Sequence, residues 1–422
     1  MDHVLGLECL ICGVRYTPSE VEYVCPKHGD DGTLDVVYDY GAIGRTINES
    51  GIEGFGSGKG IWRYKALLPV RRDSPVPPLA VGDTPLYPAP RLASELGLRE
   101  LWIKDDGREP SASFKDRASA VAVVKAREKG VQFIATASTG NAAAALACLC
   151  ASVEQPNVIF VPASAPAAKI VQLLVYGSTV LLVDGTYDDA FELCLEACRE
   201  FGWYNRNTGY NPYMTEGKKT VVYEICEQLG NETAGNWGIP DVIVVPVGDG
   251  CIIGGVHKGF KDLLALGRID RIPRIIGAQS AGSDYMWQAW IRGEDVLTKP
   301  AIRASTLADS ISAGLPRDRI KAMAAVKESG GAYVRVSDDE ILSAIPALAR
   351  GAGVFAEPAA AAAYAGLAHA AESGLVTADD RIVILATGSG LKDIDSAGSS
   401  VGEPHRIAPD LAEVKRVLGT HV

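Results

Sequence analysis

Short apolar runs alternate with longer amphipathic stretches along most of the chain from about residue 84 onward. Such runs are typical of parallel strands that are covered on both faces, and the stretches between them have helical spacing. The predicted strands are residues 102–104, 133–138, 158–163, 179–185, 241–248, 274–279 and 381–388. The predicted helices are residues 115–129, 140–151, 167–176, 187–201, 217–230, 254–266 and 358–373. This alternation predicts an α/β fold with largely parallel sheets.

The first 40 residues carry a different pattern. A C-x2-C pair and a C-x2-H pair stand twelve residues apart, at Cys9, Cys12, Cys25 and His28. Two such pairs can surround one tetrahedral zinc ion, and the residues between them alternate enough to predict a short hairpin. We therefore expect a zinc-ribbon-like segment, in which a metal would be structural because no ligand position looks open for a substrate. The alternative is that the four are unrelated surface residues.

Three other segments differ in composition from the α/β region. Residues 41–80 are rich in Gly and Pro and predict a connector. The tail after about residue 396 is rich in Ser and Gly and then briefly helical, and we assign it no chemistry. The alanine-rich stretch 359–371 is short and contains His369, so it predicts a packed helix rather than a membrane span.

The overall composition narrows the classes of partner. The 422 residues are 47% hydrophobic and 22% charged, as in soluble globular proteins, and are enough for two or three domains. With 41 Lys and Arg against 52 Asp and Glu, the net charge of −11 disfavours nucleic acid and anionic membranes as main partners. The N-terminus has no basic segment ahead of an apolar core, so nine cysteines predict reduced thiols in the cytoplasm.

Polar or glycine-rich motifs stand at four predicted strand or helix ends, and open α/β sheets bind ligands at the carboxyl ends of their strands. In SFKDR, Lys115 opens a helix. The positive end of the helix dipole disfavours its ammonium form, which makes the amine a better nucleophile and base. Taken alone, a lysine in so charged a run is more often simply solvated.

Each of the other three motifs also has an ordinary structural interpretation that needs no ligand. STGN, which ends at Asn141, is either a carboxylate pocket at a helix N-terminus or an ordinary helix cap. GDGCI, residues 248–252, is either a phosphate cradle or a plain turn. Asp249 would repel a phosphate there unless it points away or caps the helix. TGSGLKD, which begins at Thr387, could be no more than a polar turn.

Together and in this order, the motifs resemble those of the fold-type II pyridoxal-phosphate enzymes (the tryptophan synthase β-like superfamily), and among them the threonine synthase family. The resemblance covers almost the whole chain and includes the N-terminal ribbon, SFKDR, STGN, EGKKT, FAEPA and TGSGLKD. It implies two open parallel-sheet α/β domains, pyridoxal 5′-phosphate as cofactor and a homodimer, and it allows a structural Zn²⁺. The implied units are a zinc-ribbon-like segment (1–40), a connector (41–83), a large domain (84–128 and 214–395), a small domain (129–213) and a tail (396–422).

The resemblance also implies a role for each matching residue. Lys115 would hold the cofactor as a Schiff base, with Phe114 packed nearby. Asn141 would form a hydrogen bond with the pyridine hydroxyl of the cofactor, and Thr387 would face the pyridine nitrogen. The loop around the cofactor phosphate would be Gly248, Asp249, Gly250, Cys251 and Ile252. The substrate would contact Ser138, Thr139 and Gly140, and candidates for its phosphate are Ser164, Lys169 and Lys218. Glu357, in FAEPA, would be either a site residue or a helix-capping carboxylate.

The implied reaction converts O-phospho-L-homoserine and water to L-threonine and phosphate, with Lys115 as proton shuttle. Three departures from the family pattern bear on the substrate. Residues 109–112 are EPSA where the family often has NPTG, the phosphate loop is GDGCI rather than Gly-Asn-rich, and residues 164–169 contain no arginine. The nearest alternative is a β-eliminating ammonia-lyase or a β-replacement synthase, for example cysteate synthase-like, acting on serine, threonine, phosphoserine or diaminopropionate.

The sequence fits two other functional hypotheses, a non-catalytic binding module and a nicotinamide dehydrogenase, less well. A non-catalytic zinc-ribbon binding module on a degenerate scaffold would not need Lys115, STGN and Thr387, which are all intact. A nicotinamide dehydrogenase would need a strand–GxGxxG–helix unit followed by an acidic residue, and the chain has none.

Overall fold

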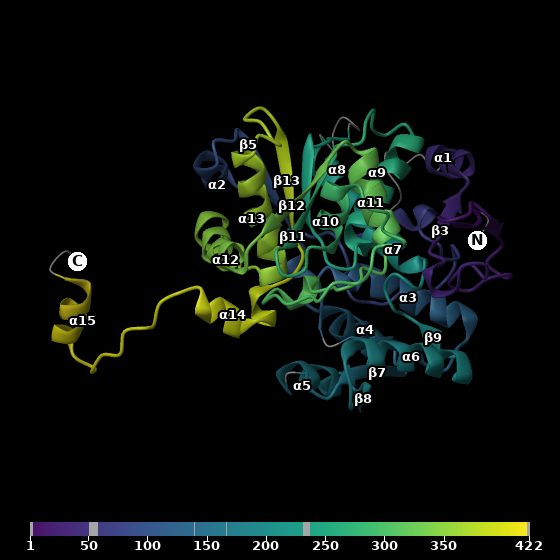
Figure 1. Cartoon of the computed structure of the whole chain (residues 1–422), viewed down its shortest axis with the longest axis horizontal. Coiled ribbons are helices and arrows are strands. Elements are labelled where there is room, and N and C mark those ends of the chain that lie inside the picture. The colour runs from purple at the N-terminus through teal and green to yellow at the C-terminus, as the bar shows by residue number, and fades with distance from the viewer. Residues whose placement is uncertain (1–2, 50–57, 139, 166, 231–236, 420–422) are drawn as a thin grey trace.

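The computed structural model describes residues 3–49, 58–138, 140–165, 167–230 and 237–419. Its strands form three sheets, and the two larger ones lie side by side in the body of the molecule (Figure 1). The fold is therefore α/β with parallel sheets, as the sequence predicts.

The largest sheet has the strand order β12-β11-β10-β13-β5-β4. Its strands are β4 (Leu86–Pro88), β5 (Glu100–Asp105), β10 (Val242–Pro246), β11 (Arg274–Ser280), β12 (Ala332–Val336) and β13 (Arg381–Ala386). All neighbours are parallel except β4, which runs antiparallel to β5. The carboxyl ends of β5, β10 and β13 thus lie along one edge, which the three motifs that follow them occupy.

Successive residues of the central strand β10 face two different cores, because side chains alternate across a strand. Val242 and Val244 pack with α2 (Pro90–Glu95), α12 (Asp338–Ala352) and α13 (Pro358–Glu372). Ile243 and Val245 pack with the helices of the other face. Those helices are α3 (Lys115–Lys129), α8 (Thr220–Leu229), α9 (Cys251–Ala265), α10 (Tyr285–Arg292) and α11 (Arg319–Glu328). Burial on both faces explains why the strand reads as a continuous apolar run.

The second sheet is smaller and entirely parallel, with the order β8-β7-β6-β9. Its strands are β6 (Ile134–Ala137), β7 (Asn157–Pro162), β8 (Thr179–Val183) and β9 (Tyr204–Asn205). The helices α4 (Asn141–Ala151), α5 (Ala167–Val175) and α6 (Tyr187–Phe201) accompany it. Helix α3 packs on both α4 and α7 (Tyr213–Lys218), so it joins this unit to the larger one.

The N-terminal segment forms an antiparallel sheet of β1 (Val4–Cys9), β2 (Arg15–Tyr16) and β3 (Leu34–Tyr38), followed by α1 (Tyr40–Glu49). The predicted hairpin within residues 14–24 is wrong in detail. Tyr16 pairs back with β1, whereas Val24 makes only an isolated bridge. The backbone N–H and the hydroxyl of Thr17 both donate to the Glu20 carboxylate. This local turn leads the chain away from β2 instead of returning it alongside.

Each predicted strand of the α/β region is present, but residues 217–230 contain the end of α7 and the whole of α8 rather than one helix. The sequence pattern did not predict the strands β4, β9 and β12 or the helices α2, α10, α11 and α12. Within β12, Arg335 is exposed because the strand lies at the sheet edge, so its sequence is not a continuous apolar run.

The chain after β13 continues through α14 (Ile394–Ser399) and ends, as far as it is described, in α15 (Leu411–Leu418), which Figure 1 shows apart from the body. None of the described helices is both long and apolar enough to cross a membrane. All nine cysteines are free thiols, as the sequence predicts.

Candidate functional site

Lys115 is fixed at the start of α3 by hydrogen bonds from the loop that follows β13. The N–H of Phe114 donates to the carbonyl of Thr387 (2.9 Å), and the N–H of Ser389 donates to that of Ala112 (3.1 Å). Phe114 is completely buried. The SFKDR and TGSGLKD motifs, more than 250 residues apart in sequence, are therefore one structural unit around Lys115.

The surroundings of Lys115 favour its neutral amine. Burial lowers its pKa to about 8, the positive charges of Lys218 and Arg206 act in the same direction, and the carboxylate of Glu357 acts against them. A lysine with a lowered pKa is a competent nucleophile and proton carrier near neutral pH. The structure thus gives Lys115 the properties that a Schiff-base lysine needs.

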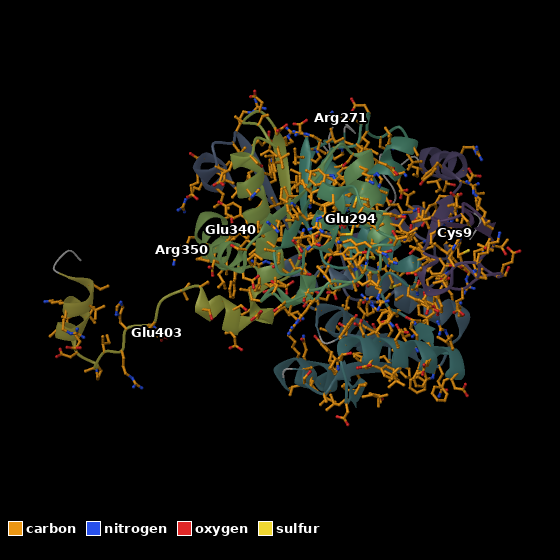
Figure 2. The ribbon with its side chains drawn as sticks, viewed as in Figure 1. Cys9, Arg271, Glu294, Glu340, Arg350 and Glu403 are labelled. Atoms are coloured by element: carbon orange, nitrogen blue, oxygen red, sulfur yellow. The ribbon has the colours of Figure 1, made fainter. Side chains whose placement is uncertain are left out.

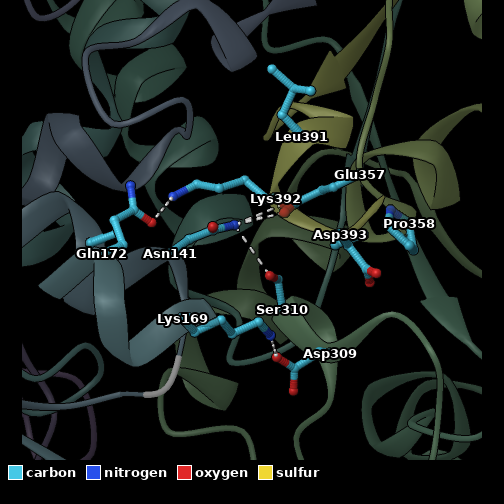
Figure 3. Close-up of a pocket in the computed structure, with 13 residues that line it drawn as sticks. Asn141, Lys169, Gln172, Asp309, Ser310, Glu357, Pro358, Leu391, Lys392 and Asp393 are labelled. Atoms are coloured by element: carbon cyan, nitrogen blue, oxygen red, sulfur yellow. Dashed lines mark hydrogen bonds and ion pairs between the residues drawn. The ribbon is translucent and has the colours of Figure 1, made fainter. Parts of the chain in front are cut away.

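Asn141 and Glu357 meet across the cleft between the two larger sheets. The Asn141 side-chain amide donates to both carboxylate oxygens of Glu357, at 2.9 Å each, and to the Ser310 hydroxyl at 3.2 Å (Figure 3). Glu357 precedes α13, yet its side chain makes no capping hydrogen bond to that helix. Burial raises the pKa of Glu357, while Lys115 opposes that rise. Of the two interpretations of Glu357, the geometry favours a site residue.

Gly388 leaves just enough space for the Glu357 carboxylate. A Cβ at position 388 would lie 2.4 Å from Oε1 of Glu357. We expect Gly388→Ala to lower the free energy of unfolding by about 1–3 kcal/mol, because the buried carboxylate would have to move. Denaturant unfolding measures this change. Gly44→Ala in α1 is the control, since a Cβ there would meet only the Leu266 side chain, at an ordinary distance of 3.9 Å. Equal stability of the two variants would contradict the close approach of Gly388 to the Glu357 carboxylate.

The loop 248–252 has the geometry of an anion cradle. Gly250 has φ +89°, and a Cβ at Gly248 would lie 2.7 Å from the backbone of Ile311, so both positions require glycine. Helix α9 begins at Cys251, and the first N–H groups of a helix have no partners within it. Asp249 points away, because its Oδ1 accepts from the N–H of Arg317 (3.2 Å). The expected conflict between Asp249 and a phosphate therefore does not arise.

Two buried cations near Lys115 lack an acidic partner among the described residues. Arg206 is 1% exposed and donates to neutral oxygens, namely the hydroxyls of Ser119 and Thr208 and the carbonyl of Lys115. Lys218 is also 1% exposed, and its charge acts on Lys115, Asp249 and Cys251. Burial lowers the pKa of Arg206 to about 10. A buried cation without a counter-ion is costly, so the site is suited to an anion.

The sequence analysis missed Arg206 and gave Lys218 only as a loose candidate. Arg206 follows the two-residue strand β9 in a polar stretch with no recognisable motif. The adjacent lysines of EGKKT look equivalent in the sequence, but Lys219 is paired with Glu216 (2.6 Å) and Asp262 (2.7 Å). Only burial and partners distinguish the free cation from the paired one.

Two of the remaining predicted substrate residues, Gly140 and Lys169, line the pocket drawn in Figure 3. Lys169 on α5 is paired with Asp309 (2.5 Å; Figure 3). Lys392, which the sequence analysis did not propose as a substrate residue, donates to Gln172 on α5 (3.4 Å; Figure 3). The Ser138 hydroxyl accepts from the N–H of Gly140 (3.2 Å). Ser164 is exposed in the turn after β7, and Thr139 lies outside the described residues. The roles of these residues in substrate binding stay predictions.

The N-terminal cysteines and histidine come together as the sequence predicts. One ligand atom from each of Cys9, Cys12, Cys25 and His28 lies within 4.8 Å of all the others. The Tyr16 hydroxyl is 3.1 Å from the Cys25 sulfur. This donor set suits tetrahedral zinc, and its identity as a zinc site stays a prediction.

Comparison with known proteins shows the family to which the chain belongs. Residues 78–388 match the family described as pyridoxal-phosphate dependent enzyme. The chain is 38% identical to threonine synthase from Methanocaldococcus jannaschii, over 97% of this chain and 98% of that protein. It is also 38% identical to threonine synthase from Methanosarcina acetivorans, over 98% of each.

Solved structures show the same fold. The processed form of threonine deaminase isoform 2 from Solanum lycopersicum superposes with a TM-score of 0.63 at 24% identity, over 75% of this chain and 87% of that one. Maize serine racemase gives a TM-score of 0.61 at 22% identity, over 75% and 92%. At these identities the likeness concerns the fold.

Proposed function

Because this chain belongs to the pyridoxal-phosphate-dependent enzymes of fold type II and is a threonine synthase-like lyase, we propose that it converts O-phospho-L-homoserine and water to L-threonine and phosphate. We further propose the predicted cytoplasmic location, with which nine free thiols agree.

The observation that carries this proposal is the pair of unpaired buried cations, Arg206 and Lys218, beside Lys115. One phosphate comes with the cofactor, and the loop 248–252 can hold it through backbone N–H groups. Two further cations then suit a second anion, which a phosphorylated substrate provides. Serine, threonine and diaminopropionate carry no such group, so they fit these cations less well.

The protein's own groups divide the chemistry among them. When bound, pyridoxal phosphate supplies an electron sink for the reacting carbons. The Lys115 amine takes a proton from the substrate's α-carbon and returns one later. The N-terminus of α4 and the Ser138 hydroxyl bind the substrate carboxylate. Arg206 and Lys218 stabilise the charge that builds on the departing phosphate. Thr387 offers the ring a hydroxyl rather than a carboxylate, which suits elimination and addition more than transamination.

Closure of the cleft protects this chemistry from bulk water. The bonds from Asn141 to Glu357 and from Lys169 to Asp309 join the small unit to the large one at the mouth. Substrate entry requires the mouth to open, and its closure excludes water until the step that consumes it.

The lowered pKa of Lys115 predicts the pH dependence of cofactor attachment. Only the neutral amine attacks an aldehyde, so the rate at which cofactor-free protein takes up pyridoxal phosphate should rise with pH to about 8 and then level off. Stopped-flow absorbance measures this rate. The pKa of an ordinary lysine is near 10.4, so a rate that still rises steeply above pH 9 would contradict the lowered pKa of Lys115.

A substrate panel tests the proposed reaction against its alternative. The cofactor-loaded protein is incubated with O-phospho-L-homoserine, serine, threonine, phosphoserine and diaminopropionate, and phosphate, ammonia and 2-oxo acids are measured. We expect O-phospho-L-homoserine to release phosphate, and we expect no 2-oxo acid as a main product of that reaction. Phosphate or ammonia from the other substrates alone, at normal cofactor occupancy, would move the assignment to the ammonia-lyase or β-replacement class.

We also propose that Cys9, Cys12, Cys25 and His28 hold a structural zinc ion. Elemental analysis of protein purified without chelators should find about one zinc per chain, and Cys25→Ser should lose it. The buried Cys226, far along the chain in α8, provides the control Cys226→Ser. Absence of zinc from the unaltered protein would leave the four residues as a metal-free cluster.

A further inference from the structure

The last described part of the chain, residues 402–419, leaves the body as an arm. Every hydrogen bond and ion pair recorded for these residues joins two residues of the arm itself. Pro404 and Pro409 lie in the extended stretch before α15. Figure 1 shows α15 separated from both large sheets, and Figure 2 shows Glu403 on the irregular stretch that leads to it. The arm thus makes none of its recorded polar contacts with its own body.

Helix α15 carries an apolar stripe that faces solvent. Leu411, Val414, Val417 and Leu418 follow the spacing of one helix face. Leu411 is 66% exposed and Leu418 57%, and none of the described residues of α15 is buried. A two-turn helix is not stable in water by itself, so its helical state requires a surface that covers this stripe.

A matching surface lies at the root of the arm. Helices α12 and α14 enclose a groove of about 330 Å³, which we call the α12–α14 groove. Its lining is mainly apolar and includes Ile345, Ala349, Phe355, Ile394 and Val401. Phe355 is 40% exposed, Ile394 54% and Val401 51%. Arg350, labelled in Figure 2, lies at this groove.

We propose that α15 of one copy of this chain docks in the α12–α14 groove of a second copy, and that the exchange is reciprocal. Val401, where the arm begins, is itself part of the groove. In a two-fold dimer each arm therefore leaves its own body beside the groove that receives the other helix, so the arrangement closes on itself.

The sequence of the arm favours exchange over return to its own groove. To fill its own groove, α15 would have to fold back within residues 402–410, which separate it from Val401. Pro404 and Pro409 instead favour an extended path, because proline restricts the backbone to open conformations. The nine residues 402–410 can span about 30 Å when extended, enough to cross to a neighbouring subunit.

Hydrogen exchange read by mass spectrometry tests the docking on the full chain. The amides of residues 411–418 should exchange at least about tenfold more slowly than those of an unprotected helix of this length. The double variant Leu411→Asp/Leu418→Asp (helix variant) and Ile394→Asp (groove variant) should each lose this protection. Ile291→Asp is the matched control, because Ile291 is 57% exposed on α10, away from the groove, and it should keep the protection. Fast exchange in the unaltered chain, or protection that survives in the groove variant, would overturn the proposal.

A mixed dimer separates exchange from docking within one chain. The helix and groove variants are co-expressed with two different tags, and the mixed dimer is isolated on both. In that dimer the groove variant still has an intact α15, and the helix variant still has an intact groove. We expect the α15 peptide of the groove variant to regain its protection, while the mass-shifted peptide of the helix variant stays unprotected. Failure to isolate a mixed dimer, or no regained protection, would overturn the proposal.

Discussion

We expect Lys115→Ala to abolish both the covalent attachment of pyridoxal phosphate and the turnover of substrate. Lys115 is the amine that both steps use, and its pKa of about 8 results from its buried position beside Lys218 and Arg206. Loss of a group that serves as attachment point and proton carrier should lower kcat by about 10³-fold or more. The measurements are the visible absorbance of the cofactor-loaded protein and the rate of phosphate release.

The matched control for this variant is Lys129→Ala. Lys129 ends the same helix, α3, but lies near the surface, where it is paired with Glu22. Its removal should leave absorbance and turnover within about twofold of the unaltered protein, because an exposed ion pair contributes little. Persistent turnover in Lys115→Ala, or an equal loss in Lys129→Ala, would contradict the assignment of Lys115.

The second large effect is expected from Arg206→Met. Removal of a cation that holds the substrate phosphate should lower kcat/KM for O-phospho-L-homoserine by about 10²-fold, as expected for the loss of a buried charge-assisted hydrogen bond of about 3 kcal/mol. Attachment of the cofactor should remain, because Lys115 and the loop 248–252 are unchanged. Turnover at full cofactor occupancy measures the effect. An unchanged kcat/KM would remove Arg206 from the substrate site.

The same variant should also separate a functional cation from a structural one. Arg117 is as buried as Arg206, but it is held by Asp106, Glu109 and Glu224. Arg117→Met should cost about 3–5 kcal/mol of unfolding free energy, since it leaves buried carboxylates unpaired. Arg206→Met removes a cation without an ion pair among the described residues and should cost far less, or even stabilise the protein. Denaturant unfolding compares the two, and a similar loss in both would argue that Arg206 is structural.

The strands of the body could be predicted because both faces of each sheet are covered. In β10 every residue is buried, so the sequence alone marks the strand, although the predicted range 241–248 extends beyond Val242–Pro246 at both ends. The edge strand β12 and the two-residue strand β9 lack that signal, since Arg335 is exposed and β9 is too short to show a pattern. The turn at Thr17 likewise depended on one local contact with Glu20.

Some residues of the candidate site could likewise be proposed from the sequence, and others could not. Lys115, Asn141 and the loop 248–252 could be proposed because each lies in a motif that resembles those of the fold-type II pyridoxal-phosphate enzymes. Arg206 could not, since its significance lies in being buried without an ion pair, which is a property of the folded chain. The hydrogen bond between Asn141 and Glu357 joins residues 216 positions apart, and no local sequence pattern predicts it.

One measurement tests the central claim most directly, namely the fate of oxygen when the reaction with O-phospho-L-homoserine runs in ¹⁸O-labelled water. In the proposed lyase reaction the C–O bond breaks and water adds to carbon. The account predicts threonine and phosphate in equal amounts, with the label in the threonine hydroxyl and unlabelled phosphate. Labelled phosphate together with homoserine would show hydrolysis at phosphorus, and would contradict the account.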